Sequence, residues 1–336
     1  MAKGFRYLDE LIHDDGTEIF LDSDIVLEDA EEFQYGDGIN IDVDDLVING
    51  NGFSIDGRGK VRLFYCTGEG ITIKNLTLKN GFCRENGGAI HIDEGEMTII
   101  DSQICNNESS EDGGAIFNED GVVNVLKSSF VENVAGDFGG AINNWGELEI
   151  RESTFEANSA NNGAAVFNDS SKMKAMDCRF VENVSFKCGA IFSNDTAELT
   201  VEKSVFSQNK AQNGGALVND ESDVSVSGCI FEGNISSCDG GAIVNFSEMT
   251  VAESRFTGNK SDRDGGAIFN KTADLTIRKS LFEFNEAAGK GTAIYGDDSE
   301  LSIVESSFSG KSDDEISLVD CVYDCEDTSF EGELWS

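Results

Sequence analysis

The sequence predicts an all-β fold, a single-stranded right-handed parallel β-helix, and two repeated phrases carry this prediction. The first phrase reads Gly113-Gly114-Ala115-Ile116 in its plainest form and occurs nine times at spacings of 24 to 26 residues. The second, Phe-x-x-Asn, as at Phe206 and Asn209, runs at the same period. Two phrases that keep one period along most of a chain indicate a repeat architecture, in which each repeat forms one coil.

Alternation around each Phe predicts the strands of a coil. Apolar residues precede Phe206 by seven and five positions, at Leu199 and Val201, and a small residue, Ser204, precedes it by two. This period of two places one face inward and the other outward. In the other phrase, every alanine is followed by an aliphatic residue that we expect to point inward. We therefore expect about 11–12 coils of about 25 residues with three short strands each, right-handed as parallel crossovers are.

The recurring Phe and Asn residues are interpreted as structural. Phe would fill the core, and Asn would form ladders between coils, because its amide both donates and accepts hydrogen bonds and tolerates turn conformations. The residues so interpreted are Phe130, Phe155, Phe180, Phe206, Phe231, Phe256 and Phe282, with Asn118, Asn144, Asn168, Asn219, Asn245 and Asn270.

The chain is expected to have three parts. Apolar residues at positions 5, 8, 11 and 12 predict an amphipathic helix that caps the first coil over residues 1–16. The β-helix is expected over residues 17–312, with the regular repeats at 78–310. Residues 313–336 are interpreted as a degenerate last coil and C-terminal cap, with Trp335 over the end.

Charge limits the classes of partner. The formal net charge of −40 disfavours nucleic acid and anionic membranes, which select basic patches. A solvated acidic surface and a cation-binding face both fit this charge. No run of 18 apolar residues occurs, so we expect no membrane insertion, and the first twenty residues lack the apolar stretch of a secretory signal.

The sequence gives little indication of a metal site or of redox-active cysteines. Weak calcium-ligand candidates lie in acidic loops, without the nonapeptide signature of calcium-binding β-helices. These candidates are Asp220, Glu221, Asp223, Asp297, Asp298 and Glu300. No other cofactor is indicated. Nine cysteines without a CxxC pair indicate neither a zinc site nor a redox motif, and Cys178 and Cys229 replace serine in a small-residue column.

No catalytic residue can be assigned from the sequence. The acidic residues recur with the repeat, as solvated turns do, and the two histidines, His13 and His91, have no visible partner and are interpreted as structural. An enzyme on this scaffold should carry an insertion that builds a cleft. The period is unbroken from Gly87 to Ile294, so only the irregular segment before residue 70 could hold one.

The two phrases together resemble the repeats of chlamydial polymorphic outer-membrane proteins. They are also similar to adhesin-like proteins of gut methanogenic archaea, which often contain a segment similar to the one here from Leu46 to Gly57. The resemblance covers about residues 60–310 and implies a β-helix that serves as an adhesin at the cell surface. The missing signal and anchor leave a cytoplasmic location open.

Three alternative functions are compatible with these features of the sequence. The first is a non-enzymatic adhesin-like module, expected to be monomeric, that binds a cell-surface glycan or protein along its side. The second is a polysaccharide lyase or glycoside hydrolase, and the third is a structural spacer. β-Helices host both adhesion and carbohydrate chemistry, so the fold alone does not choose among them.

Overall fold

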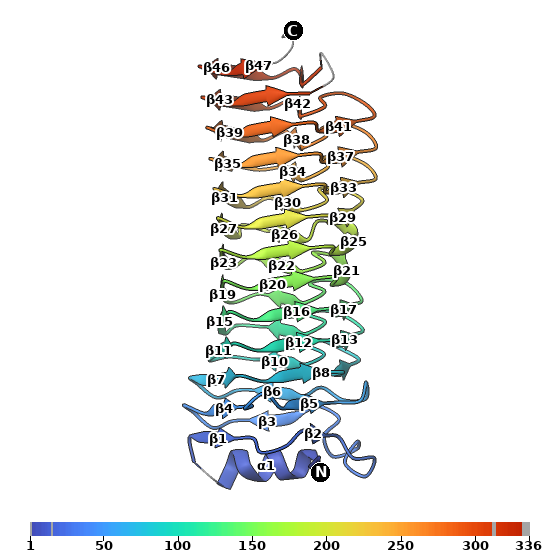
Figure 1. Cartoon of the computed structure of the whole chain (residues 1–336), viewed down its shortest axis with the longest axis vertical. Coiled ribbons are helices and arrows are strands. Elements are labelled where there is room, and N and C mark those ends of the chain that lie inside the picture. The colour runs from blue at the N-terminus through green and yellow to red at the C-terminus, as the bar shows by residue number, and fades with distance from the viewer. Residues whose placement is uncertain (1, 15, 311–313, 331–336) are drawn as a thin grey trace. The chain divides into compact units, whose positions relative to one another are not determined.

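The fold class predicted from the repeats is confirmed. The computed structural model, which describes residues 2–14, 16–310 and 314–330, is an all-β right-handed parallel β-helix of about 12 turns of roughly 26 residues. Its described residues contain a single helix, α1 (Phe5–Asp14), and the chain divides into two compact units, Met1–Phe167 and Asn168–Ser336. Within each unit, strands of successive coils lie one above another (Figure 1).

The strands of sheet A include those that contain the Phe-x-x-Asn phenylalanines. In the first unit they are β2 (Ile25–Val26), β5 (Ser54–Asp56), β8 (Thr77–Lys79), β12 (Gln103–Cys105), β16 (Ser129–Val131) and β20 (Thr154–Glu156). In the second they are β24 (Arg179–Val181), β28 (Val205–Ser207), β32 (Ile230–Glu232), β36 (Arg255–Thr257), β40 (Leu281–Glu283), β44 (Ser307–Ser309) and β47 (Ser329–Phe330).

Sheet B precedes sheet A in each coil and has the longest strands. In the first unit they are β1 (Glu18–Phe20), β4 (Val47–Asn49), β7 (Ile71–Lys74), β11 (Glu96–Ile100), β15 (Val122–Leu126) and β19 (Glu147–Arg151). In the second they are β23 (Lys172–Met176), β27 (Glu198–Glu202), β31 (Asp223–Ser227), β35 (Met249–Ala252), β39 (Asp274–Arg278), β43 (Glu300–Val304) and β46 (Val322–Glu326).

The strands of sheet C include those that begin at the aliphatic residue of Gly-Gly-Ala-Ile. In the first unit they are β3 (Ile39–Ile41), β6 (Phe64–Cys66), β10 (Ile90–Ile92), β14 (Ile116–Asn118) and β18 (Ile142–Asn144). The unit boundary falls within β22 (Val166–Asp169). In the second unit they are β26 (Ile191–Asn194), β30 (Leu217–Asp220), β34 (Ile243–Asn245), β38 (Ile268–Lys271), β42 (Ile294–Asp297) and β45 (Ile316–Val319).

A fourth set of strands, sheet D, was not expected, because the sequence predicted three strands per coil. These strands follow the ladder asparagines and are mostly two residues long, too short for an alternation pattern to reveal. In the first unit they are β9 (Phe82–Cys83), β13 (Glu108–Ser109), β17 (Val134–Ala135) and β21 (Ser159–Asn162). In the second they are β25 (Val184–Cys188), β29 (Lys210–Ala211), β33 (Ile235–Ser236), β37 (Lys260–Ser261) and β41 (Glu286–Ala287).

The turn before each sheet C strand explains the paired glycines. Gly113 has a φ of +60°, a left-handed conformation that disfavours residues with a Cβ. A Cβ on Gly114 would collide with the backbone oxygen of Gly140 in the next coil. The first glycine therefore supplies the turn, and the second allows close stacking of the coils.

Helix α1 covers the first coil with Phe5, Leu8 and Ile12, all almost fully buried. Its N-terminus is held from outside the helix. The carboxylate of Glu31 accepts hydrogen bonds from the backbone N–H of Phe5, at 3.0 Å, and of Arg6, at 2.9 Å. These bonds satisfy two of the free N–H groups at the helix start, where a negative charge is favoured. At the other end, the proposed Trp335 cap lies outside the described residues.

Candidate functional site

The outer face of sheet C carries a row of aromatic side chains in the first unit. Tyr65, His91, Phe117 and Trp145 come from successive coils, and we call them the aromatic row. Their ring centroids are 4.9, 5.1 and 5.1 Å apart in that order. Phe117 is buried, Tyr65 and His91 are half-buried, and Trp145 is 44% exposed. The row therefore offers aromatic surface mainly at Trp145, with smaller contributions from Tyr65 and His91, while the ring of Phe117 packs beneath them.

Two carboxylates hold the polar members of this row. Asp93 accepts a hydrogen bond from the Tyr65 hydroxyl at 3.1 Å, and Glu119 lies 3.0 Å from Nε2 of His91. Burial, with a smaller contribution from the positive charge of Arg62, lowers the pKa of His91 below its usual value. Burial, with the neighbouring Asp93 carboxylate, raises the pKa of Tyr65. Both groups are therefore neutral at pH 7, and the row presents rings and hydrogen-bonding groups without a cation.

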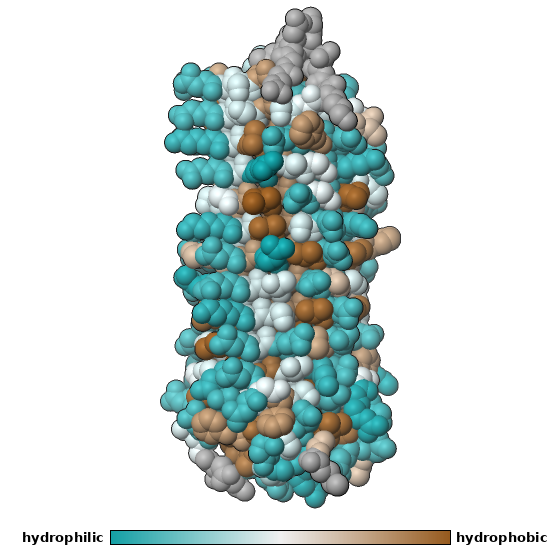
Figure 2. Space-filling view, viewed as in Figure 1, coloured by the Kyte–Doolittle hydropathy of each residue, from teal (hydrophilic) through white to brown (hydrophobic). Residues whose placement is uncertain are grey.

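The second unit presents a similar arrangement on the same sheet. Phe246 occupies the position of Trp145, directly after a sheet C strand, and is 39% exposed. Its ring lies 6.4 Å from Phe269, which in turn lies 5.4 Å from Tyr295. In the view of Figure 2, scattered hydrophobic side chains lie near the middle of the visible face, interrupted by neutral and polar ones, and polar side chains predominate at its edges.

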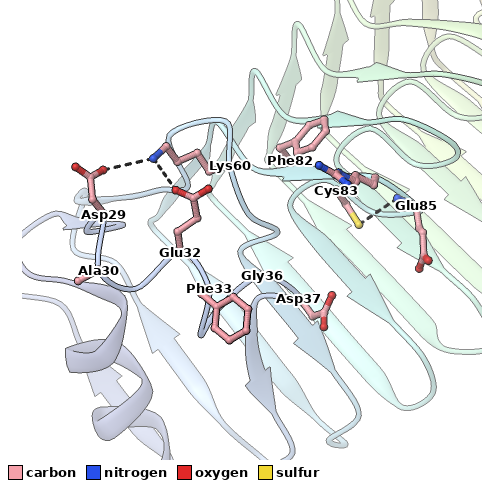
Figure 3. Close-up of a pocket in the computed structure, with 11 residues that line it drawn as sticks. Asp29, Ala30, Glu32, Phe33, Gly36, Asp37, Lys60, Phe82, Cys83 and Glu85 are labelled. Carbon is pink, nitrogen blue, oxygen red and sulfur yellow. Dashed lines mark hydrogen bonds and ion pairs between the residues drawn. The ribbon is translucent and has the colours of Figure 1, made fainter.

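The segment before residue 70 builds a cleft, where the sequence left room for one. The turns between β2 and β3 project as a loop, residues 28–38, that faces the turn after β5 and the turn after β9. The cleft between them has a volume of ≈ 760 Å³ (Figure 3). Its lining residues are Asp29, Ala30, Glu32, Phe33, Gly36, Asp37, Lys60, Phe82, Cys83, Arg84 and Glu85.

Loop 28–38 is anchored from beneath. Glu31 caps α1, and Tyr35 is buried, donates a 2.9 Å hydrogen bond to Asp9 and has its ring 5.9 Å from that of Phe5. Gly38 ends the loop at a φ of +90°, where an added Cβ would lie 3.1 Å from the backbone nitrogen of Phe64. The loop is therefore held in place by buried side chains, and the residues between these anchors face solvent.

Charged groups on the two walls of the cleft differ in their pairing. On the loop side, Lys60 binds Glu32 at 2.7 Å and Asp29 at 3.4 Å. Within the part of the chain that the structure describes, the side chains of Asp37, near the end of the same loop, and of Arg84 and Glu85, across the cleft, have no ion-pair partner. The carboxylates beside Lys60 are therefore neutralised, whereas Asp37, Arg84 and Glu85 are free to bind a ligand.

Arg62 lies between the cleft and the aromatic row. It is 5% exposed, and its Nη2 donates to Sγ of Cys83 at 3.0 Å and to the carbonyl oxygen of Asn86 at 2.7 Å. Its Cζ also lies 5.7 Å from the centroid of the Tyr65 ring. One buried guanidinium thus supports the floor of the cleft and the first member of the row.

The predicted structural residues lie where stacking requires them. The phenylalanines Phe130, Phe155, Phe180, Phe206, Phe231, Phe256 and Phe282 are each 0% exposed. Among the Gly-Gly-Ala-Ile asparagines, Asn118 donates to Asn144 at 2.7 Å. Asn219 donates to Asn245 at 2.8 Å, and Asn245 to Asn270 at 2.7 Å. Asn168 is buried, and the next coil places Ser193 beside it.

The predicted calcium candidates are not gathered into one site. Asp220 ends β30 and Asp223 begins β31, with Glu221 in the turn between them; Asp297, Asp298 and Glu300 repeat this pattern between β42 and β43. No group of three or more His, Cys, Asp or Glu side chains in the described ranges is placed to hold a metal ion. The nine cysteines are free thiols. No helix in the described part of the chain has the length and apolar character needed to cross a membrane.

The aromatic row was not predicted from the sequence, because it lies beyond the inward aliphatic residue of Gly-Gly-Ala-Ile, at positions to which no role was assigned. The next position holds an aromatic ring in many coils, including His91, Phe117, Phe269 and Tyr295. His91 showed no partner in the sequence, whereas the structure places it 3.0 Å from Glu119, with its ring between those of Tyr65 and Phe117. Recurrence of rings at an outward position was the signal that could have identified the row.

Comparison with known proteins supports the fold. A family model described as "right handed beta helix region" matches residues 32–231 and 190–331. A solved structure titled L. reuters 100-23 SRRP is similar over 98% of this chain and 98% of its own, with 13% identity and a TM-score of 0.37. No curated protein matches the sequence. Because the family model covers most of the chain, this protein belongs to the right-handed β-helix family.

Proposed function

We propose that this protein is a non-enzymatic, adhesin-like module that binds a glycan along the outer face of sheet C. The observation that carries the proposal is the aromatic row, which supplies one ring per coil over Tyr65, His91, Phe117 and Trp145. Aromatic rings with polar groups beside them suit sugars, because a sugar ring has apolar faces and hydroxyls at its edge.

The flanking groups favour a neutral glycan. Asp93 and Glu119 can accept hydrogen bonds from hydroxyls while they hold the row. The net charge of −40 repels polyanions at long range and so disfavours acidic polysaccharides. The second unit offers a comparable surface at Phe246, Phe269 and Tyr295, so we expect each unit to bind independently.

A neutral-glycan array followed by titration of the best ligand tests this function. Trp145→Ala should weaken binding at the site of the first unit by roughly tenfold, and Phe246→Ala at the site of the second, because each removes exposed aromatic contact area. Phe186→Ala is the matched control, since Phe186 is 72% exposed but lies on sheet D and not on sheet C. Equal losses in all three variants, or no retained glycan, would contradict the proposal.

The rival enzymatic function makes a different prediction for the same glycans. A hydrolase would release new reducing ends, and a lyase would release unsaturated products. Binding without product is the result expected of the non-enzymatic function that we propose. Product release from purified protein would replace the binding function with a catalytic one.

A further inference from the structure

The cleft of Figure 3 has features that the proposed binding along sheet C does not use. Phe33 is 100% exposed, yet it lies in a loop that Glu31 and Tyr35 fix from beneath. Phe82, half-buried, stands on the opposite wall. The anchored loop keeps the Phe33 ring exposed to water, so the ring does not contribute the stabilisation that burial would give. A ligand that covers the ring would bury this apolar surface, and that burial would favour binding.

The size of the cleft fits a small ligand. Its volume of ≈ 760 Å³ lies in the range of small-molecule sites, which is roughly 300–1,000 Å³. The two rings supply apolar contact, and the unpaired carboxylates of Asp37 and Glu85 supply hydrogen-bond acceptors. A ligand with one apolar face and a polar edge, as in a pyranose, is complementary to this combination.

The charged residues around the cleft favour a positively charged ligand. Asp29 and Glu32 are neutralised by Lys60, and Asp29 is also bound by Arg58 at 3.1 Å. The two unpaired carboxylates, Asp37 on the same loop and Glu85 on the opposite wall, outnumber the single unpaired cation, Arg84. The field of a chain with net charge −40 also steers cations toward the molecule and repels anions.

We propose that this cleft binds an amino sugar, with the protonated amine between the carboxylates of Asp37 and Glu85 and the sugar ring against Phe33. An ammonium group near an aromatic face gains further attraction from the ring quadrupole. The site is separate from the aromatic row, so it does not depend on the function proposed there.

Three matched probes test the assignment by calorimetric titration of the full chain. D-glucosamine, D-glucose and D-glucuronate share a pyranose ring and differ in carrying an amine, a hydroxyl or a carboxylate. Glucosamine should bind roughly fivefold more tightly than glucose, the effect of one partly exposed ion pair, and glucuronate should bind most weakly. A preference for glucuronate, or the absence of binding by all three, would overturn the proposal.

Variants assign the preference to residues. The double variant Asp37→Asn with Glu85→Gln should abolish the difference between glucosamine and glucose, while Phe33→Ala should weaken both ligands equally. Phe20→Ala, at a 56% exposed ring on β1, is the control for an exposed aromatic elsewhere in the first unit. Each variant changes a surface residue, so unchanged thermal unfolding can confirm that the fold is intact.

The variant Arg84→Gln should change the affinity for glucosamine in the opposite direction to the carboxylate variants. Removal of this cation should tighten glucosamine binding, because the guanidinium repels the amine. If glucosamine binding is instead lost, Arg84 holds an anionic or neutral ligand and the proposed charge selection is wrong. An oligolysine peptide that binds more tightly than glucosamine and displaces it would assign the ammonium to a protein partner, which also overturns the amino-sugar proposal.

Discussion

Asp112 shows how a single carboxyl group at a turn sets a pH dependence. It lies before a Gly-Gly pair, and its Oδ1 accepts a 3.1 Å hydrogen bond from the backbone N–H of Phe138 in the next coil. Burial raises the pKa of Asp112 to about 6, with smaller contributions from Asp137 and Glu111. Asn86 holds the same place one coil earlier and makes the same bond at 3.1 Å without a charge.

The sign of the effect follows from the raised pKa. Because the folded state holds the Asp112 proton more tightly than the unfolded state, the free energy of unfolding should fall as pH rises from about 4 to about 6. Asp112→Asn should therefore stabilise the protein above pH 6, by about 1 kcal/mol after allowance for partial exposure, and have no such effect at pH 4. Urea unfolding at both values measures this difference.

Asp120→Asn is the control, because Asp120 is an exposed acid on a nearby turn. It should change the free energy of unfolding by less than about 0.5 kcal/mol at either pH. Equal stabilisation by Asp112→Asn at pH 4 and pH 7 would show that the cause is not the carboxylate charge.

Within an element, the stacked rings of sheet A provide the test of core packing. Phe206 in β28 is 0% exposed, and its ring lies 4.7 Å from that of Phe180 and 4.9 Å from that of Phe231, nearly parallel to both. Phe206→Ala leaves a cavity and removes two ring contacts, so it should lower the free energy of unfolding by about 3–5 kcal/mol. Phe186→Ala, at an exposed ring of the same unit, should cost less than about 1 kcal/mol.

A loss below about 1 kcal/mol for Phe206→Ala would contradict the inward orientation of this column. Denaturant unfolding followed by two probes is the suitable measurement, because repeat proteins can unfold in parts and a single transition must first be demonstrated.

Residues that repeat along an element are the ones that sequence alone could place. Asn209 donates to Asn234 and accepts from Asn183, both at 3.0 Å, and the identical residue at one period predicts this ladder. Loop 28–38 occurs once, so no periodicity could reveal its fold. Its position depends on Glu31 reaching α1 and Tyr35 reaching Asp9, contacts over more than twenty residues that no local pattern encodes.

For the whole molecule, charge is the property that most limits stability. The chain has 64 acidic and 24 basic residues, and several bases form ion pairs between coils, such as Lys172 with Glu198 at 3.3 Å and Lys271 with Asp297 at 3.0 Å. Each such exposed pair contributes only about 0–1 kcal/mol. The unpaired acids remain in excess, so the repulsion among them outweighs the attraction within the ion pairs. Salt screens both interactions and should therefore relieve more repulsion than it removes attraction.

The melting temperature should therefore rise by several degrees between about 20 mM and 500 mM sodium chloride, where the Debye length shrinks to a few ångströms. Calcium and magnesium chloride at matched ionic strength separate screening from binding. Screening alone gives equal rises with both salts, whereas an additional rise with calcium, removed by Asp220→Asn with Asp223→Asn, would place a cation in the loop between β30 and β31. A melting temperature that stays level or falls with sodium chloride would show that the ion pairs, and not the excess of acids, dominate the surface.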